Sequence, residues 1–365
     1  MRNGRSQYGM SDSPYSKLQE FLDRFPLGFP RTDSGVEIRI LRNLFTEEEA
    51  RVAVLLSPMP EEASRIAGRA GIDEAQLASK LESMSKRGLI FRVRRRGRTH
   101  FSSAPFMIGL YEYSVKRMDK ELAGLYREYY ETAYLAEMGA SNIPGFKVIP
   151  ITEKVAADTA LYPYAEIRDQ VRSARKISVA ECICRKEARL TGRGCDHPME
   201  TCLSFGAAAE YYIENGLGRE IGAQQALEIL EDADRAGLVH AGANTRHLSN
   251  ICNCCPCCCA SMKGITTRGH DRIKYLNALY EAAIDKETCT GCGDCLQRCP
   301  VGAITLEDRA WVNRDKCLGC GLCAGACSVE AVALRGREDR QEPFERVLDL
   351  GLAILRGKEA NATRC

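Results

Sequence analysis

The segment ICNCCPCCCA, residues 251–260, carries six cysteines within the eight positions from Cys252 to Cys259. Thiolates are strong ligands for iron and zinc, and a C-x2-C spacing lets two of them reach one metal or cluster. Three such pairs overlap here, at 252/255, 254/257 and 255/258. Adjacent cysteines differ, because neighbouring side chains diverge and do not readily serve one metal together. The segment therefore predicts two nearby centres, or one cluster with thiols to spare.

Four more cysteines precede this segment, two in ECICRKE and two in GCDHPMETC. We interpret the ten thiols as ligands of one or two iron–sulfur centres, in preference to zinc and to redox-active thiols or disulfides. Ten is two more than a pair of four-ligand centres needs. The candidate metal ligands are Cys182, Cys184, Cys195, Cys202, Cys252, Cys254, Cys255, Cys257, Cys258 and Cys259.

Two other residue types in this region could serve such a centre. Arg185, within ECICRKE, either supplies positive charge beside a cluster or forms an exposed salt bridge, and the sequence leaves both open. Histidine is also a metal ligand, but a lone histidine is more often a structural residue. The histidines of this region are His197, His240, His247 and His270.

A second group of cysteines forms an internal repeat. CTGCGDCLQRCPVGAITL begins at Cys289, and CLGCGLCAGACSVEAVAL begins at Cys317, so that all four cysteines superpose at an offset of 28 residues. Each copy reads C-x2-C-x2-C-x3-C. Three thiolates on one tight loop can hold three irons of a cubane, and the fourth ligand must come from elsewhere. The intervening glycines allow positive φ and bring amide N–H groups close to the sulfurs.

This repeat resembles the bacterial two-[4Fe-4S] ferredoxin domain, over roughly a seventh of the chain. The resemblance implies two [4Fe-4S] clusters, with the fourth cysteine of each run ligating the other cluster. Pro300 matches the family's proline after the first run, whereas Ser328 replaces the second proline and removes a rigid turn but no ligand. The implied ligand sets are Cys289, Cys292 and Cys295 with Cys327, and Cys317, Cys320 and Cys323 with Cys299. The whole order of motifs is also similar to uncharacterised ferredoxin-like proteins of anaerobes.

The elements that position these cysteines predict an α+β multidomain chain. It combines an N-terminal winged helix, a mostly helical cysteine-rich middle domain and a C-terminal ferredoxin-like domain. The expected segments are a loosely ordered arm (1–35), the winged-helix-like domain (36–105), a helix and linker (106–164), the cysteine-rich domain (165–282), the ferredoxin domain (283–336), and a closing helix and tail (337–365). Within 106–164, residues 111–138 are expected to form one long helix whose Tyr126, Tyr130 and Tyr134 belong to a core or an interface.

The winged-helix prediction rests on three helical patterns and a hairpin. Thr46 and Glu49 predict a capping box, and Leu77, Leu81 and Met84 share one face of a later helix. IFRVRRRGRTHF alternates like a strand and turns at Gly97. Winged helices bind DNA or dock proteins. Five arginines crowd the predicted wing, but acidic residues begin the helix that would enter the groove, so we favour docking over DNA binding. The arginines of the predicted wing are Arg92, Arg94, Arg95, Arg96 and Arg98, and the acidic residues at the start of the helix are Asp73 and Glu74.

The charge and hydrophobicity of the sequence argue against several classes of protein. With 51 basic and 49 acidic residues the net charge is +2, which argues against a general nucleic-acid coat. No apolar run is long enough to span a bilayer and no secretory signal is present, so we expect a cytoplasmic chain whose thiols bind metal. We therefore predict an electron-transfer protein that serves a redox partner or an oxidoreductase complex. The alternatives are a redox-sensing transcription regulator and a reductase with a catalytic cluster in the middle domain.

Overall fold

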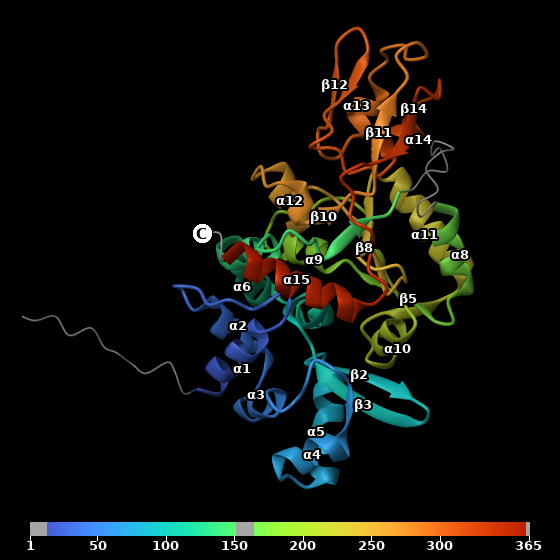
Figure 1. The fold of residues 1–365 in the computed structure, drawn as a ribbon. Coiled ribbons are helices and arrows are strands. Elements are labelled where there is room, and N and C mark those ends of the chain that lie inside the picture. The colour runs from blue at the N-terminus through green and yellow to red at the C-terminus, as the bar shows by residue number, and fades with distance from the viewer. Residues whose placement is uncertain (1–12, 151–163, 363–365) are drawn as a thin grey trace, which may run out of the picture. The chain divides into compact units, whose positions relative to one another are not determined.

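The computed structural model describes residues 13–150 and 164–362 and forms two compact units (Figure 1). The first unit takes in the described residues up to Ser114 together with Gly124–Glu137, and the second takes in the rest. Helices and strands are interspersed along the described ranges, so the expected mixture of helix and sheet is confirmed. No helix in these ranges is long and apolar enough to cross a membrane.

The first unit contains short helices and a three-stranded sheet of order β1-β3-β2. The predicted capping box is confirmed, because Thr46 and Glu49 each accept a hydrogen bond from the other's backbone N–H, at 3.2 and 2.9 Å. Leu77, Leu81 and Met84 are buried along α5, as expected. The elements are α1 (Pro14–Asp23), α2 (Val36–Leu44), α3 (Glu47–Ala53), β1 (Glu61–Glu62), α4 (Ala63–Ala70), α5 (Glu74–Lys86), β2 (Ile90–Arg95) and β3 (Arg98–Ser103).

The expected loosely ordered N-terminal arm is wrong for the part that the structure describes. Helix α1 packs against α2 and α3. Leu18 and Leu22, one turn apart, are buried, and Phe29 beyond the helix is fully buried. The apolar stretch LQEFLDRF is thus one face of an amphipathic helix that belongs to the core of the first unit. Residues 1–12 lie outside the described residues.

The expected long helix over 111–138 is present only from Lys120 onward. A short 3-10 turn and loop replace its first part. The tyrosine stripe is core, as one of the two interpretations held, because Tyr126, Tyr130 and Tyr134 surround the Phe106 ring at centroid distances of 5.7, 5.9 and 4.6 Å. The elements are η2 (Phe106–Leu110), η3 (Glu112–Ser114), α6 (Lys120–Tyr129), η4 (Tyr130–Tyr134) and α7 (Leu135–Met138).

The cysteine-rich region is built on a sheet, so the expected mostly helical domain is wrong. Seven strands run in the order β10-β4-β8-β9-β6-β5-β7, and all pairs except β10–β4 are antiparallel. Strands such as NICNC and VHAGA contain few β-branched residues, which is why their sequences do not stand out as strands. The elements are β4 (Phe146–Val148), α8 (Tyr164–Ser173), β5 (Ile177–Glu181), α9 (Ile183–Leu190), β6 (Glu200–Phe205), α10 (Ala207–Glu214), β7 (Arg219–Ile221), α11 (Ala223–Arg235), β8 (Val239–Ala243), β9 (Asn250–Cys254), α12 (Ala260–Thr266), η5 (Arg272–Lys274) and β10 (Leu276–Asn277).

The repeat near the C-terminus folds around two strand pairs, β11 with β14 and β12 with β13. Each cysteine run contains a short helix, α13 or α14, which includes the third cysteine of the run. The predicted closing helix is also present. The elements are β11 (Tyr280–Ile284), α13 (Asp294–Arg298), β12 (Ile304–Leu306), β13 (Ala310–Val312), α14 (Leu322–Ala326), β14 (Val332–Gly336) and α15 (Val347–Ala362).

Candidate metal centres

The loops of the two cysteine runs depend on glycine. Gly319 has φ +64°, and a Cβ atom there would lie 2.0 Å from the carbonyl oxygen of Tyr280. Gly291 occupies the matching position in the first run, with φ +74°, and its Cβ would lie 2.5 Å from the carbonyl oxygen of Asp308. A side chain would collide at either position, so the sequence needs glycine there both for the backbone conformation and for the close approach of a backbone carbonyl group.

The loops line two small cavities. Each cavity takes three cysteines from one run and the fourth cysteine from the other run. The cavities therefore divide the eight cysteines into the same two sets that the ferredoxin resemblance implies. One is lined by Cys299, Cys317, Cys320 and Cys323, and the other by Cys289, Cys292, Cys295 and Cys327.

Backbone N–H groups point at two of these sulfurs. Ala282 donates to the Sγ of Cys317 at 3.4 Å, and Ala303 donates to the Sγ of Cys299 at 3.2 Å. Burial raises the pKa of Cys320 to about 12, so a thiolate there needs a compensating cation. Four converging sulfurs with N–H donors and a shortage of positive charge fit an iron–sulfur cluster, whose irons supply that charge.

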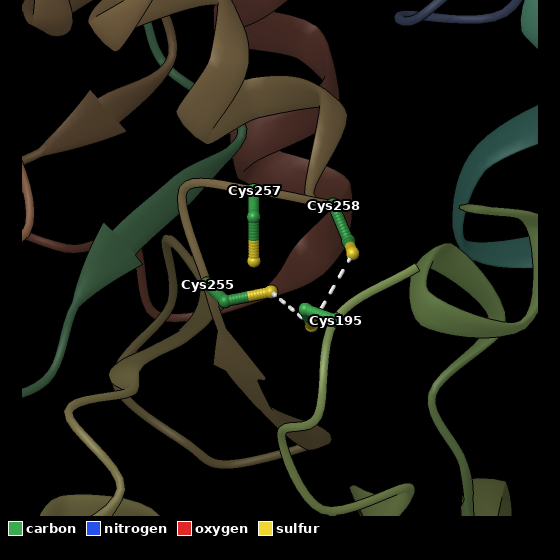
Figure 2. Close-up of side chains that lie close together, drawn as sticks. All are labelled: Cys195, Cys255, Cys257 and Cys258. Atoms are coloured by element: carbon green, nitrogen blue, oxygen red, sulfur yellow. Dashed lines mark hydrogen bonds between the residues drawn. The ribbon is translucent and has the colours of Figure 1, made fainter. Parts of the chain in front are cut away.

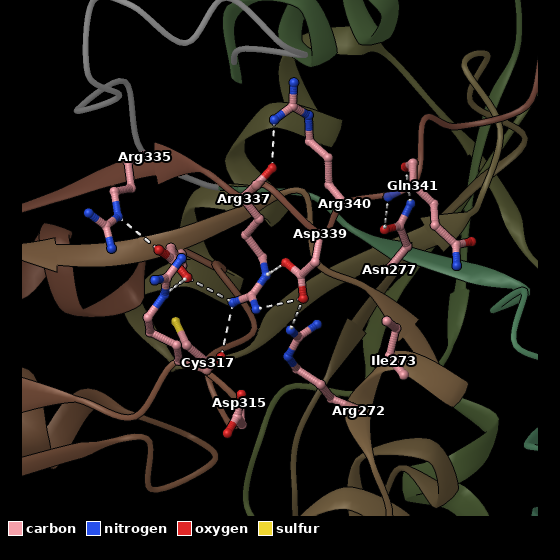
Figure 3. A network of polar contacts seen from close by, with 12 residues as sticks. Arg272, Ile273, Asn277, Asp315, Cys317, Arg335, Arg337, Asp339, Arg340 and Gln341 are labelled. Atoms are coloured by element: carbon pink, nitrogen blue, oxygen red, sulfur yellow. Dashed lines mark hydrogen bonds and ion pairs between the residues drawn. The ribbon is translucent and has the colours of Figure 1, made fainter.

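A buried carboxylate ties β11 to the second cysteine run. Glu281 is fully buried, and its oxygens accept hydrogen bonds from Arg314 (Nε, 2.8 Å), Arg335 (Nε, 2.8 Å) and Arg337 (Nη1, 3.1 Å). Figure 3 shows Arg335 and Arg337 in this network and Cys317 close by. Because Glu281 directly precedes Ala282, the network holds in place the N–H group that faces Cys317.

Residues 282–334 match the family model of a 4Fe-4S dicluster domain. The match covers both cysteine runs and parts of β11 and β14, and residues 280–337 are called the dicluster domain below. Comparisons with curated proteins and with solved structures found no significant match to the chain.

Four cysteines outside the dicluster domain converge on one point (Figure 2). Their sulfurs all lie within 4.8 Å of one another, with Cys195 3.9 Å from Cys255 and 3.5 Å from Cys258. Cys195 follows α9, whereas the other three lie in the loop between β9 and α12. These residues, named here the four-cysteine set, are Cys195, Cys255, Cys257 and Cys258.

The other six cysteines of the region interact with one another instead. Strand β9 carries two of them and β6 carries one, while three lie at the start of α9 or α12. These residues, named here the six-cysteine group, are Cys182, Cys184, Cys202, Cys252, Cys254 and Cys259.

The division of the ten cysteines into these two groups differs in two ways from what their spacing in the sequence predicts. Of the three overlapping C-x2-C pairs, only 255/258 falls within one set, because 252 and 254 lie on strand β9 and turn toward the six-cysteine group. Adjacent cysteines do diverge at 254/255 and at 258/259. They converge at 257/258, where the loop ahead of α12 brings both side chains to the same point. Spacing alone cannot give this result, because it depends on where the strand ends.

Arg185 lies beside both groups of cysteines. Its side chain is fully buried, and its Nη1 donates to the Sγ of Cys255 at 3.7 Å and to the carbonyl oxygen of Asn253 at 3.0 Å. Burial by itself would lower the pKa of Arg185, but the sulfurs of Cys182 and Cys255 raise it above its ordinary value. The exposed salt bridge left open by the sequence is therefore wrong, and Arg185 supplies positive charge to the thiols.

The charge of Arg185 acts together with the crowding of the thiols. Hydrogen bonds with Cys258 and Cys257, and the Arg185 guanidinium, lower the pKa of Cys255 to about 5. Burial and the interaction with Cys255 raise the pKa of Cys257 to about 12. The four-cysteine set thus provides one ready thiolate, and a bound cation would release the remaining protons.

The four-cysteine set contains no histidine. His240 is buried on β8, and its Nδ1 is hydrogen-bonded to the side-chain oxygen of Asn253. Burial lowers the pKa of His240 to about 4, so its ring is neutral at pH 7. We interpret His240 as a structural residue that orients Asn253 between two cysteines of β9.

Proposed function

We propose that this chain is an iron–sulfur electron-transfer protein that passes single electrons between a redox partner protein and a metal centre in its cysteine-rich region. The observation that carries the proposal is the exchange of the fourth cysteine between the two cavities of the dicluster domain. Eight cysteines arranged in this way supply the ligands of two [4Fe-4S] clusters. No bond-making residue is required, because the chain holds and tunes the carriers.

The roles of the residues follow from this geometry. Bound [4Fe-4S] clusters accept and release single electrons at potentials set by hydrogen bonds, charge and burial. The N–H groups of Ala282 and Ala303 stabilise negative charge on the sulfurs and so favour the reduced state. Arg298, which precedes Cys299, donates to the carbonyl oxygen of Arg235 at 3.0 Å and fixes the dicluster domain to the end of α11.

The four-cysteine set is the proposed first metal centre of the cysteine-rich region. Three of its members come from one loop and the fourth comes from a distant loop, which gives a closed set of four thiolates. Such a set suits a cubane cluster, and it also suits tetrahedral zinc. We favour iron–sulfur because zinc is redox-inert and could not accept electrons from the dicluster domain.

The test is metal analysis and EPR on protein purified without oxygen. Reduced protein is expected to carry about eight irons in the dicluster domain and about four more in the four-cysteine set. The variants C299S and C327S should each lose about four irons per chain. C365S, which also replaces a cysteine by serine, is the control and should keep the wild-type iron content. A chain that binds no iron, or whose clusters cannot be reduced, would end the proposal. Zinc in the four-cysteine set would leave the dicluster domain as an electron carrier and exclude electron transfer to this set.

For the N-terminal elements we propose a winged-helix-like module that docks the redox partner. The order α3-β1-α4-α5-β2-β3 and the three-stranded sheet support the comparison. Asp73 caps α5 by accepting the N–H of Gln76 at 2.9 Å, and Glu74 follows in its first turn. Negative charge at this end of the helix favours a protein partner over a DNA groove.

A DNA-binding regulator is the second candidate, because Arg95 and Arg96 are exposed at the tip of the β2–β3 hairpin. A gel-shift titration at low salt separates the two candidates. Binding that weakens steeply with salt and is lost in an R95Q/R96Q variant would favour the regulator. Absence of DNA affinity at low salt would leave docking as the function of this module.

A further inference from the structure

The strand register brings three members of the six-cysteine group together. Strands β6 and β9 pair with Leu203 opposite Ile251, so the next pair in this antiparallel register places Cys202 opposite Cys252. Cys252 and Cys254 are two residues apart on β9 and therefore face the same side of the sheet.

The remaining members close a ring of sulfurs. The Cys182 thiol interacts with those of Cys184 and Cys202, and the Cys184 thiol interacts with that of Cys259. Cys259 is the N-cap residue of α12, and its thiol interacts with that of Cys254. Cys254 interacts with Cys252, which faces Cys202. Each of the six sulfurs thus has a neighbour on either side, and four separate segments contribute to the ring.

The surroundings of the ring favour negative charge. Arg185 is fully buried, and no carboxylate among the described residues pairs with it. A buried cation without a counter-charge is strongly unfavourable, so the anions that stabilise it must be the cysteine sulfurs around it. Those sulfurs belong to the six-cysteine group, through Cys182 and Cys202, as well as to the four-cysteine set. The amide nitrogen of Asn250 also donates to the Sγ of Cys252 at 3.7 Å.

We propose that the six-cysteine group is a second metal centre of the cysteine-rich region, separate from the four-cysteine set, and that it holds a polynuclear iron–sulfur cluster with Arg185 as its buried counter-charge. Tetrahedral zinc or a single cubane uses four thiolates, so a ring of six exceeds the needs of either. A larger cluster can use all six. This centre is additional to the carriers of the proposed function.

The experiment compares metal content and Mössbauer spectra of the full chain, purified without oxygen from cells grown on ⁵⁷Fe. Wild-type protein should contain iron beyond the roughly twelve atoms of the dicluster domain and the four-cysteine set. The C202S/C252S variant should lose this extra iron and keep the rest. The matched C257S/C258S variant should lose the iron of the four-cysteine set and keep that of the six-cysteine group.

Three results would overturn the proposal. The first is a wild-type iron content that the dicluster domain and the four-cysteine set account for completely. The second is the same loss of iron in both double variants, which would mean one merged centre. The third is disulfide bonds within the six-cysteine group, which alkylation and mass spectrometry of wild-type protein with and without a reductant would reveal. This last measurement does not depend on the folding of a variant. If the EPR signals of the dicluster domain are retained in any of these cases, only the second centre is rejected and the proposed electron-transfer function still stands.

Discussion

The Nη1 atom of Arg185 lies 3.7 Å from the Sγ of Cys255, inside the protein and away from solvent. Coulombic interactions also link Arg185 to Cys182 and Cys202, so one guanidinium serves both the four-cysteine set and the six-cysteine group. A positive charge in this position stabilises the more reduced, more negative state of any cluster bound there. We therefore expect Arg185 to tune any iron centre bound there without being one of its ligands.

Replacing Arg185 by glutamine should make the reduction potential of the iron in the cysteine-rich region more negative by roughly 50–100 mV, because a buried unit charge is lost. Potentiometric EPR measures this shift. R185K should keep most of the charge and shift the potential less. The potentials of the dicluster domain should stay constant in both variants. The exposed α8 variant R172Q is the control, and equal potentials in R185Q and R172Q would exclude the tuning role.

Replacing Gly319 by alanine should remove iron from the cavity that Cys317 lines, because the new Cβ would collide with the carbonyl oxygen of Tyr280 and the backbone has φ +64°. We expect a loss of about four irons per chain, measured by elemental analysis. G325A is the matched control, since a Cβ on Gly325 meets no atom within 4 Å. Full iron content in G319A would mean that the loop can open without losing its cluster.

Replacing Glu281 by glutamine should destabilise the dicluster domain by roughly 2–4 kcal/mol, because three arginines lose their shared counter-charge. Burial alone would raise the pKa of Glu281, but hydrogen bonds from Arg314 and Arg335 hold it below its ordinary value. The stabilisation is therefore present above the unfolded-state pKa and is lost as the pH falls through the lower, folded-state pKa. Thermal loss of cluster absorbance measures it.

The exposed residue Glu287 provides the control for this experiment, as E287Q makes the same chemical change without touching the arginines. Equal midpoints for E281Q and E287Q would contradict the stabilising role of the buried carboxylate.

Lys147 should make stability depend on pH in the alkaline range. Its side chain is 1% exposed, its Nζ donates to the carbonyl oxygen of Thr245 at 2.6 Å, and burial lowers its pKa to about 8 from 10.5. Between these pH values the unfolded chain holds a proton that the folded chain has released, so stability rises with pH. Relative to K147M, wild-type protein should gain up to about 3 kcal/mol from pH 8 to 10.5.

Unfolding curves of wild type and K147M across this range measure the gain, with the exposed Lys86→Met exchange as a control for the loss of a lysine. Parallel pH dependences of wild type and K147M would show that Lys147 keeps its ordinary pKa in the folded protein.

Local sequence patterns predict the structure correctly where the interacting residues lie within one short segment. The capping box of Thr46 and Glu49 and the hairpin around Gly97 form as expected, because their partners are only a few residues apart. The seven-stranded sheet is not evident from the sequence, because its strands are only two to six residues long and some of them, such as β8 and β9, contain few β-branched residues. Helix α1 differs from the expected loosely ordered arm, because its short apolar face is stabilised by packing against α2 and α3, which lie further along the chain.

The spacing of the cysteines along the sequence is enough to identify one part of this chain. Cysteine runs at C-x2-C-x2-C-x3-C spacing identify the dicluster domain, because three ligands of one cluster are local in the chain. The division of the ten other cysteines into a set of four and a group of six, with Arg185 beside both, follows from the fold and not from the spacing. The physical reason is that these thiols come from strands and loops distant in sequence, whose register and ends fix which sulfurs meet.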